Sequence, residues 1–439
     1  MRWDWSGKVM KMEPNTVPAG YKRTEVGVLP QDWAVVSVSD VSSTGIGMTP
    51  SRNHPVRYFD KGTHWWAKTT DLNNAVVYET EERITDIALK ETSLKVYPAG
   101  TVLVAMYGNA EQIGKTGLTA IPVCINQTLA AIYPIDGRLN ARFLFHYLNY
   151  RADYWQTVAS NSRKDPHITS RDVKSLRLPL PSFDEQTAIA NALSNVDALI
   201  TALEQLIAKK RKVKTGAMQQ LLTGKVRLPP FAHHPDGSPK GMPPCKLGDI
   251  PEDWEVVPFS TLVDLVPSRI MPKSAGGGEK CVELEHIAQG TGRLTGLTMT
   301  TDTPSHKRRF QCGDVLFGKL RSYLKKYWMA EFDGVCSTEI WVFRAKAGTC
   351  HRFIHQIVQT ESFIACASEG YGTQMPRADW KAVKAHLIRK PGLAEQSAIS
   401  EVLEAFDDEL HALSNQLTKV RRLKQGMMQQ LLTGKTRLV

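Results

Sequence analysis

The sequence lacks long apolar runs and paired cysteines. Its 439 residues contain no stretch of 18 consecutive apolar residues, and the opening MRWDWSGKVMKME lacks the apolar core and small-residue cleavage site of a secretory signal. The seven cysteines are odd in number and never form a C-x-x-C pair, so neither a disulfide framework nor a thiolate zinc site is indicated. We therefore expect a cytoplasmic protein with reduced cysteines and no membrane contact.

A complete nucleotide-binding loop is also absent. Gly108 and Gly114, with Lys115 after them, resemble a phosphate-binding loop, but five residues separate the glycines where the motif requires four. Gly117 and Pro122 argue against the helix that must follow such a loop. ATP binding by this loop is therefore excluded, and Lys115 is kept as a candidate DNA contact.

Two other catalytic motifs are incomplete. A Pro-Pro-Phe sequence at 229–231 follows Leu228, where methylation of an exocyclic base nitrogen would need Asn, Asp or Ser, so we interpret it as linker. Glu283, Glu285 and His286 could bind a metal ion, but the Pro-Asp and Lys that would complete a nuclease site are missing. On one strand the two glutamates would share a face, and a solvated strand face is the simpler interpretation. No catalytic or metal-binding residue is assigned.

The charge balance is strongly basic. The formal net charge of +11 and the pI of about 9.2 favour polyanionic partners, and nucleic acid is the first candidate. Basic and aromatic side chains interleave at several places, although each one could also be a solvated surface residue. Arg and Lys neutralise phosphates, and Arg can also read guanine. The candidate DNA-binding residues are Arg52, Lys61, Lys115, Arg163, Lys164, Lys273, Arg308, Arg309, Lys319, Arg321, Tyr323, Lys325, Lys326, Gln374 and Arg377.

The sequence repeats itself. KTGAMQQLLTGKVRL at 214–228 recurs as KQGMMQQLLTGKTRL at 424–438, with 12 identities in 15 positions at an offset of 210 residues. GVLPQDWAVV at 27–36 recurs as GDIPEDWEVV at 248–257, at an offset of 221 residues. The segments between these echoes differ almost completely. Self-similarity at so long a period indicates a duplicated half-protein with two different inserts. Trp33 and Trp254, which lie in the repeated segments 27–36 and 248–257, are predicted to be buried in the hydrophobic cores of the two globules.

Each half ends in a predicted long helix. In the first, Ser182 and Glu185 form a capping box and Gly224 is placed to end the helix. Apolar residues at alternating spacings of three and four predict a coiled-coil seam, and the two helices are expected to pack antiparallel on each other. The alternative is that each helix packs on its own globule. The predicted seam residues are Ile189, Val196, Leu199, Leu203, Leu206, Ile399, Phe406, Leu410, Leu413 and Leu417.

These features predict an α+β fold. Two mixed α/β globules would be separated by two long antiparallel coiled-coil helices, related by a pseudo-twofold internal repeat. The first globule should contain short strands, for example at 101–107, and one helix at 141–159. The predicted segments are an N-terminal extension at 1–20, a globule at 21–181, a spacer helix at 182–228, a Pro-rich linker at 229–247, a second globule at 248–390 and a second spacer helix at 391–439.

Together these motifs resemble the specificity subunit of Type I restriction-modification systems. The resemblance rests on the doubled QQLLTGKxRL ends, the doubled PxDWxVV openings, the Glu-Gln helix starts, CINQ at 124–127 and GVCSTE at 334–339. One departure is that the Pro-Leu-Pro at 179–181 is reduced to RKP at 389–391 in the second half.

The resemblance implies that the globules are target-recognition domains, each reading half of a bipartite double-stranded DNA site, with the helices setting the gap. It also implies two methyltransferase subunits that bind S-adenosylmethionine, and two motor-nuclease subunits that use ATP and Mg²⁺. The chain itself would be non-catalytic and bind no cofactor. The alternatives are a scaffold that does not read DNA, or an autonomous DNA methyltransferase or nuclease.

Overall fold

The chain forms two compact units in a computed structural model. The structure describes residues 17–109, 111–160, 166–267, 269–270, 278–300, 305–369 and 375–438. The first unit combines Met1–Leu203 with Gln416–Val439, and the second is Glu204–Asn415. Each unit therefore holds one globule together with part of both long helices.

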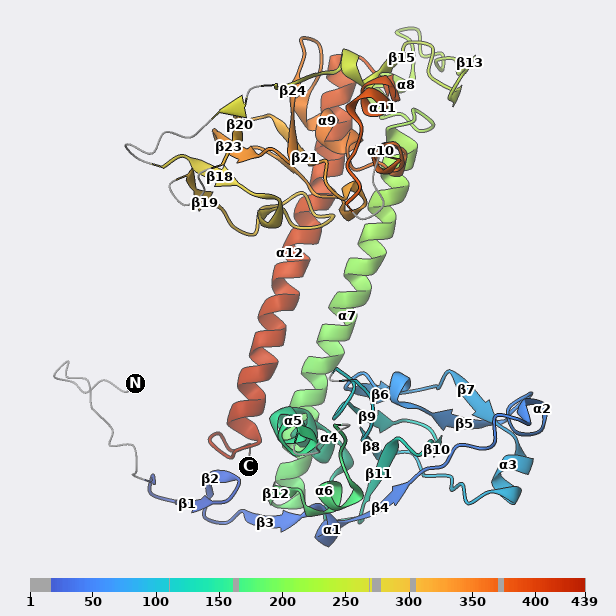
Figure 1. The fold of residues 1–439 in the computed structure, drawn as a ribbon, viewed down its shortest axis with the longest axis vertical. Coiled ribbons are helices and arrows are strands. Elements are labelled where there is room, and N and C mark those ends of the chain that lie inside the picture. Colours follow the sequence, from blue (N-terminus) through green and yellow to red (C-terminus); the bar gives the residue numbers. More distant parts are fainter. Residues whose placement is uncertain are drawn as a thin grey trace, which may run out of the picture. The chain divides into compact units, whose positions relative to one another are not determined.

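Both predicted long helices are present. They are α7 (Phe183–Leu221) and α12 (Leu393–Leu431), each of 39 residues, or about 58 Å at 1.5 Å per residue (Figure 1). The Ser182 hydroxyl accepts a hydrogen bond from the Glu185 N–H (3.2 Å), which is one of the two bonds of the predicted capping box, while the Glu185 carboxylate accepts from Trp33 and Arg437. Gly224 and Gly434 follow the helix ends with φ of +75° and +66°, a left-handed conformation that favours glycine.

The helix segments within each unit are antiparallel, as predicted. In the first unit Lys424, close to the end of α12, pairs with Asp197, in the first half of α7 (2.6 Å). In the second unit Lys214, close to the end of α7, pairs with Asp407 of α12 (2.6 Å).

The predicted seam of α7 is wrong at Leu199 and Leu206. These side chains are 45% and 38% exposed, whereas Leu193, Leu203 and Ile207 are buried. Alternating spacings of three and four can start at either of two adjacent positions, and position 200 is also apolar, so the pattern did not determine which line is buried. Of the other predicted seam residues of α7, Ile189 and Leu203 are buried and Val196 is half-buried. In α12, Ile399 is buried and the other predicted seam residues are half-buried: Phe406, Leu410, Leu413 and Leu417.

The first globule contains two main sheets. One has the strand order β4-β11-β8-β9-β6, and the other has the order β10-β5-β7, in which β10 and β5 are parallel. The strands are β4 (Ser42–Ile46), β5 (His64–Ala67), β6 (Ala75–Val77), β7 (Glu82–Ile84), β8 (Val102–Ala105), β9 (Thr116–Thr119), β10 (Cys124–Ile125) and β11 (Leu129–Pro134).

The predicted single helix at 141–159 is two helices. The structure has α4 (Ala141–Tyr150) and α5 (Ala152–Ser160), separated at Arg151, whose ψ of 32° departs from helical geometry. Both helices contribute to a core that includes Trp33, Phe143 and Trp155. The remaining elements of the first globule are β1 (Tyr21–Thr24), β2 (Gly27–Pro30), β3 (Ala34–Ser37), α1 (Val38–Val41), α2 (Pro55–Tyr58), η1 (Thr69–Asp71), α3 (Asp86–Glu91), α6 (Ser170–Ser175) and β12 (Arg177–Leu180).

The second globule repeats this plan with different strands. Its sheets have the orders β16-β24-β21-β22 and β17-β20-β23-β18-β19, and β18 and β23 are again parallel. The strands are β16 (Val263–Leu265), β17 (Arg269–Ile270), β18 (Lys280–Val282), β19 (Thr298–Met299), β20 (Lys307–Phe310), β21 (Val315–Gly318), β22 (Tyr327–Met329), β23 (Gly334–Ser337) and β24 (Ile340–Ala345). The remaining elements are β15 (Glu255–Pro258), η2 (Phe259–Thr261), η3 (Leu284–His286), η5 (Ser322–Leu324), α9 (His351–Ile357), α10 (Glu361–Ser368), α11 (Trp380–Ala385) and β25 (Leu387–Lys390).

The Pro-rich segment 229–247 is folded against the second globule. It contains α8 (Pro229–Ala232) and β13 (Pro244–Cys245), and β13 pairs with β14 (Gly248–Asp249). Lys240 forms an ion pair with Asp253 (2.6 Å), which fixes the segment beside the repeated opening motif.

The repeated motifs form the same cluster of contacts in each unit, around a buried tryptophan and a buried glutamate. We call Asp32, Trp33, Glu185 and Arg437 the first clamp, and Asp253, Trp254, Glu395 and Arg227 the second clamp. In the first clamp, Arg437 donates to Glu185 (2.5 Å) and Asp32 (2.8 Å), and Trp33 Nε1 donates to Glu185 (3.0 Å).

The second clamp has the same bonds. Arg227 donates to Glu395 (2.5 Å) and Asp253 (2.7 Å), and Trp254 Nε1 donates to Glu395 (2.9 Å). Trp33 and Trp254 are 0% and 5% exposed, which confirms that they plug the cores. In each clamp the arginine comes from the opposite sequence repeat to its three partners.

Candidate nucleic-acid interface

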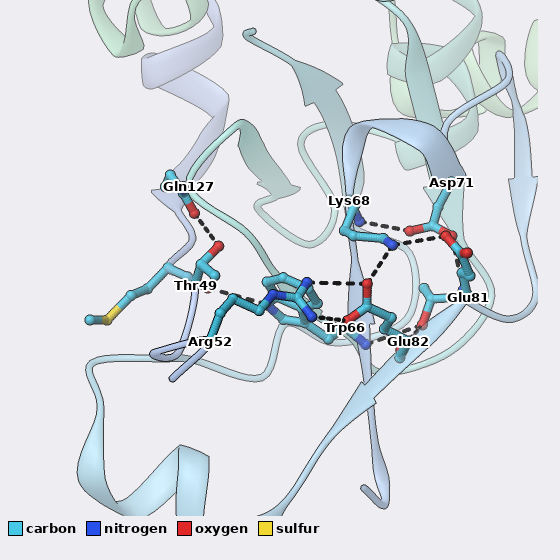
Figure 2. A network of polar contacts seen from close by, with 10 residues as sticks. Thr49, Arg52, Trp66, Lys68, Asp71, Glu81, Glu82 and Gln127 are labelled. Carbon is cyan, nitrogen blue, oxygen red and sulfur yellow. Dashed lines mark hydrogen bonds and ion pairs between the residues drawn. The ribbon is translucent and has the colours of Figure 1, made fainter. Parts of the chain in front are cut away.

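The carboxyl ends of the parallel strands β5 and β10 carry a polar network in the first unit. Because the two strands are parallel neighbours, the residues that follow them, Lys68 and Asn126–Gln127, emerge at the same edge. We define the first strand-end network by the residues labelled in Figure 2: Thr49, Arg52, Trp66, Lys68, Asp71, Glu81, Glu82 and Gln127.

Glu82 is the centre of this network. It accepts hydrogen bonds from Arg52 (2.6 Å) and from Lys68 (2.6 Å), and Lys68 also reaches Glu81 (2.8 Å). The Arg52 hydrogen bond, followed by that from Lys68, holds the pKa of Glu82 below its usual value. The Arg52 guanidinium also lies over the Trp66 ring, 5.2 Å from its centroid. The charged groups are therefore held in fixed positions.

The rest of the network is set by backbone and amide contacts. The Lys68 N–H donates to Asp71 (2.7 Å), which fixes the turn after β5, and the Thr49 hydroxyl bonds the Gln127 side chain (Figure 2). Carboxylates outnumber cations here, so the network does not have the charge of a phosphate site. Its fixed amide, hydroxyl, guanidinium and carboxylate groups instead suit the donor and acceptor pattern of base edges.

The second unit carries a different network at the corresponding strand ends. Glu283 follows β18 and pairs with Lys307 (2.5 Å), whose side chain is 3% exposed. Glu339 comes shortly after β23 and accepts a hydrogen bond from Arg377 (2.9 Å), which raises the pKa of Arg377. We call Glu283, Lys307, Glu339 and Arg377 the second strand-end network.

Glu283, Glu285 and His286 do not lie on the predicted strand. Residues 284–286 form the short helix η3, and Glu283 precedes it as its N-cap. The His286 ring Nδ1 accepts a hydrogen bond from the Glu283 N–H (3.0 Å), so the turn folds back on itself. The prediction of a strand was wrong because two charged residues at alternate positions fit a tight turn equally well.

A rigid turn presents basic and aromatic side chains beside the second network. Arg321 and Lys325 have φ of +51° and +50° and bracket η5, and Tyr323 between them is 52% exposed. The Arg321 N–H donates to the carbonyl of Pro376 (2.8 Å), and the Ser322 hydroxyl donates to that of Ala367 (2.8 Å). Left-handed backbone at residues other than glycine is costly and concentrates at functional sites.

The structure distributes the other candidate DNA-binding residues unevenly. Lys61 and Arg309 are exposed, Lys115 and Lys319 are half-exposed, and Lys325 pairs with Glu361 (2.6 Å). Two candidates serve the fold instead: Arg308 is buried and donates to the Val266 carbonyl (3.0 Å), and Lys326 donates to the Leu284 carbonyl (2.7 Å). Arg163, Lys164, Lys273 and Gln374 lie outside the described residues.

Sequence reasoning assigned no site role to most members of the two networks. Of the first network only Arg52 was a candidate, and of the second only Arg377. Gln127 and Glu339 did belong to the quoted CINQ and GVCSTE motifs, so the signal for them was present. Lys307 lies in the basic run at 306–309, from which only Arg308 and Arg309 were chosen, whereas Lys68, Glu81 and Glu82 had no local sequence signal.

One buried cluster has the composition of a hydrolase triad but not its chemistry. His146 Nε2 lies 3.1 Å from the Ser194 hydroxyl, and Asp197 lies 3.8 Å from His146 Nδ1. His146 is 1% exposed, and burial, followed by the charge of Lys424, lowers its pKa to about 3. An enclosed imidazole with so low a pKa is a poor general base near neutral pH, so we interpret the cluster as structural.

Within the described ranges, no group of three or more His, Cys, Asp or Glu side chains could hold a metal ion. The loop at 108–115 leads into strand β9, consistent with the rejection of a phosphate-binding loop. Among the helices that the structure describes, none is long and apolar enough to cross a membrane.

Comparison with known proteins gives concordant matches. The family model for the Type I restriction modification DNA specificity domain matches residues 30–214. The chain is 30% identical over 310 residues to the Type I restriction enzyme EcoDI specificity subunit of Escherichia coli, covering 64% of this chain and 69% of that protein. It is 23% identical over 430 residues to the Type I restriction enzyme MjaVIII specificity subunit of Methanocaldococcus jannaschii, covering 93% and 94%.

Solved structures agree on the fold. The crystal structure of the Type-I restriction-modification system S subunit from M. genitalium matches with a TM-score of 0.57 and 14% identity, covering 91% of this chain and 96% of that one.

Proposed function

Because the chain belongs to the family of Type I restriction-modification specificity subunits, we propose that it reads a bipartite DNA sequence, one part with each globule. It is a non-catalytic subunit. The observation that carries the proposal is the pair of strand-end networks, which occupy corresponding strand ends in the two units but consist of different residues. A repeated frame with different polar groups at the same place suits two different base sequences.

The proposal extends to assembly. We infer that two methyltransferase subunits, which bind S-adenosylmethionine and methylate adenine, and two motor-nuclease subunits, which use ATP and Mg²⁺, join this chain in the cytoplasm. The doubled QQLLTGKxRL motif supports two equivalent attachments. Helices α7 and α12, which each continue from one unit into the other, would set the gap between the half-sites.

Exchange of one globule tests the proposal. Replacing residues 27–180 with the matching segment of a relative should change the bases methylated in one half-site and leave the other half-site intact, because each strand-end network is built within one unit. Methylation mapping of DNA treated with the chain and its methyltransferase partner gives the answer. Altered bases in both half-sites would contradict independent reading by the two globules. If the wild-type chain shows no sequence preference, the proposal that it reads DNA is refuted.

The exposed turn of the second unit should contribute phosphate contacts. Arg321 is exposed, stands on a rigid turn and forms no ion pair with another described residue, so Arg321→Ala should weaken binding to all sequences. If one phosphate contact is lost, the slope of log affinity against log salt should fall by about 0.9. In contrast, Glu82→Gln should relax base preference in the half-site read by the first unit, by about 1–3 kcal/mol, with little change in slope. An unchanged slope for the arginine variant would place Arg321 away from DNA.

A further inference from the structure

One pocket of the second unit lies at a place that a tyrosine occupies in the first. The pocket has a volume of about 320 Å³ and lies beside the end of α7, against α10 and β25 (Figure 1). Its lining includes Met218, Leu222, Ile357, Leu387 and Arg389. All of the lining residues belong to the second unit, so the internal repeat gives the pocket a counterpart in the first unit.

Helices α4 and α9 occupy equivalent places in the two units. The residue before each helix, Asn140 and Cys350, donates its N–H to a glutamine side chain of a spacer helix, Gln186 and Gln396 (2.8 and 2.9 Å). Both pairs are related by an offset of 210 residues. The same offset relates β12 to β25, which pair with β3 and β15 in the same register.

A tyrosine fills the counterpart of the pocket. Tyr147 of α4 is 2% exposed, and its hydroxyl donates to the carbonyl of Arg177 in β12 (3.1 Å). At the corresponding two positions the second unit has Ile357 and Leu387. Isoleucine is shorter than tyrosine and carries no hydroxyl, so the second unit lacks both the ring and its hydrogen bond.

The Leu387 carbonyl is an acceptor on the open side of β25. This strand forms a two-stranded sheet with β15, in which the Phe259 N–H donates to the His386 carbonyl (2.8 Å). Bonded positions alternate in an antiparallel pair, so the carbonyl of Leu387, the next residue, points away from β15. A hydroxyl group in the pocket can therefore make the hydrogen bond that Ile357 cannot make.

Arg389 adds a buried donor to the lining. It stands where the first unit has Pro179, the position at which the second half departs from Pro-Leu-Pro. Its guanidinium donates to the Leu247 carbonyl, but its Nε atom is buried and forms no hydrogen bond with a described residue. A hydroxyl group both donates and accepts, which is the chemistry that Leu387 and Arg389 together require.

We propose that this pocket binds a phenol, that is, a small single-ring aromatic molecule with a hydroxyl group. The ring packs against Met218, Leu222 and Ile357. The hydroxyl donates to the Leu387 carbonyl and accepts from Arg389 Nε. The volume is at the lower end of the range for ligand sites and suits one ring. The bound molecule joins α9 to β25, as the tyrosine of the first unit joins α4 to β12.

A free molecule suits this pocket better than a tyrosine side chain of a partner protein. The attachments inferred above for the doubled QQLLTGKxRL motif are equivalent, whereas the pocket and its counterpart differ. A partner that docks in the same way on both halves could insert a ring into only one of them. The choice of a free ligand rests on that part of the proposed function, but the pocket and its chemistry do not.

Titration of the full chain with p-cresol, which is the tyrosine side chain as a free molecule, tests the proposal. We expect one saturable site with a Kd of about 0.1–1 mM, as for an efficient ligand of this size. Toluene lacks the hydroxyl and should bind about 3- to 10-fold more weakly, because it leaves both polar groups of the pocket unpaired. Methyl NMR locates the site: the Met218 resonance should shift, and that of Met428, its counterpart in the first unit, should not.

Ile357→Tyr supplies the ring from the chain itself. The variant should keep the fold, because the first unit has tyrosine at this position, and it should weaken p-cresol binding by at least about tenfold since the pocket is then filled. The matched control Ile357→Val leaves the pocket open and should bind within about threefold of the wild type, because one methylene is lost.

Several outcomes would overturn the proposal. They are the absence of saturable binding, equal affinity for toluene, and undiminished binding by folded Ile357→Tyr. Equal shifts of Met218 and Met428 would show general partition into apolar sites and would also overturn it.

N-acetyl-tyrosinamide distinguishes the two sources of a phenol ring. It carries peptide groups on the same ring and should bind about tenfold more weakly than p-cresol, because those polar groups must be desolvated. If it binds as tightly, the pocket takes a side chain of a protein and the assignment of a free phenol is wrong. None of these measurements involves DNA or a partner subunit, so their failure is distinct from failure of the proposed function.

Discussion

Arg227→Ala should destabilise the second unit by about 3–5 kcal/mol, the cost of removing one partner from a buried ion pair. The Arg227 side chain is 7% exposed and its main partner, Glu395, is 4% exposed, so the substitution leaves a carboxylate without solvent or counter-ion. Asp253 and the Trp254 ring also lose their contact with the guanidinium. Hydrogen-exchange mass spectrometry of the full chain should show lost protection at 393–403 and 250–257, with the first globule unchanged.

Two comparisons make this prediction specific. Arg437→Ala removes the corresponding arginine of the first clamp and leaves Glu185, which is 0% exposed, without its cation; because Arg437 itself is 34% exposed, the space that its side chain vacates opens to water, and the loss should be smaller. Replacing both buried partners, as Arg227→Met with Glu395→Leu, should recover much of the stability because no charge is left unpaired. Equal protection in Arg227→Ala and the wild type would show that the clamp does not hold the unit together.

The two long helices could be predicted from the sequence because the motifs at their ends are repeated. Two copies of the QQLLTGKxRL motif and heptad spacing predicted both long helices, and Ser182 marked the start of α7 correctly. The clamps were not predicted, because Arg227 and Glu395 are 168 residues apart and no local pattern connects them. The seam of α7 was misplaced at Leu199 and Leu206 because apolar residues occupy adjacent positions, and only packing selects between them.

The strand-end networks show why site residues were harder to predict than the fold. Lys68 and Gln127 come to one edge through the parallel pairing of β5 with β10, which spans 58 residues of sequence between Trp66 and Cys124. Basic residues were chosen by charge and clustering, and this criterion cannot distinguish Arg308, which is buried, from Arg309, which is exposed. Glu81 and Glu82 were missed for the opposite reason, since a search for phosphate contacts passes over carboxylates, and Glu283 was considered only as a metal ligand.

The clamps also predict what half of the chain will do alone. A fragment of residues 1–228 contains Asp32, Trp33 and Glu185 from the first clamp and only Arg227 from the second. Neither clamp can therefore form within one copy of the fragment. Two copies can close both, with Arg227 of each copy in the place that Arg437 occupies in the intact protein. Lys214 of one copy can likewise replace Lys424 in its ion pair with Asp197 of the other.

We therefore expect the fragment to form a homodimer that reads the same half-site twice in inverted orientation. The dimer should be less stable than the intact chain for two reasons. Lys210 would take the place of buried Val420, and Ala217 would take the place of the larger Met427, which packs on the first core. Sedimentation analysis gives the oligomeric state, and selection from random duplexes gives the bases. The matched control is the same fragment with Arg227→Ala, which should remain largely monomeric because each copy would present a buried Glu185 without its cation. A monomeric parent fragment, or a dimer unaffected by Arg227→Ala, would show that the exchange of arginines between repeats does not join the halves.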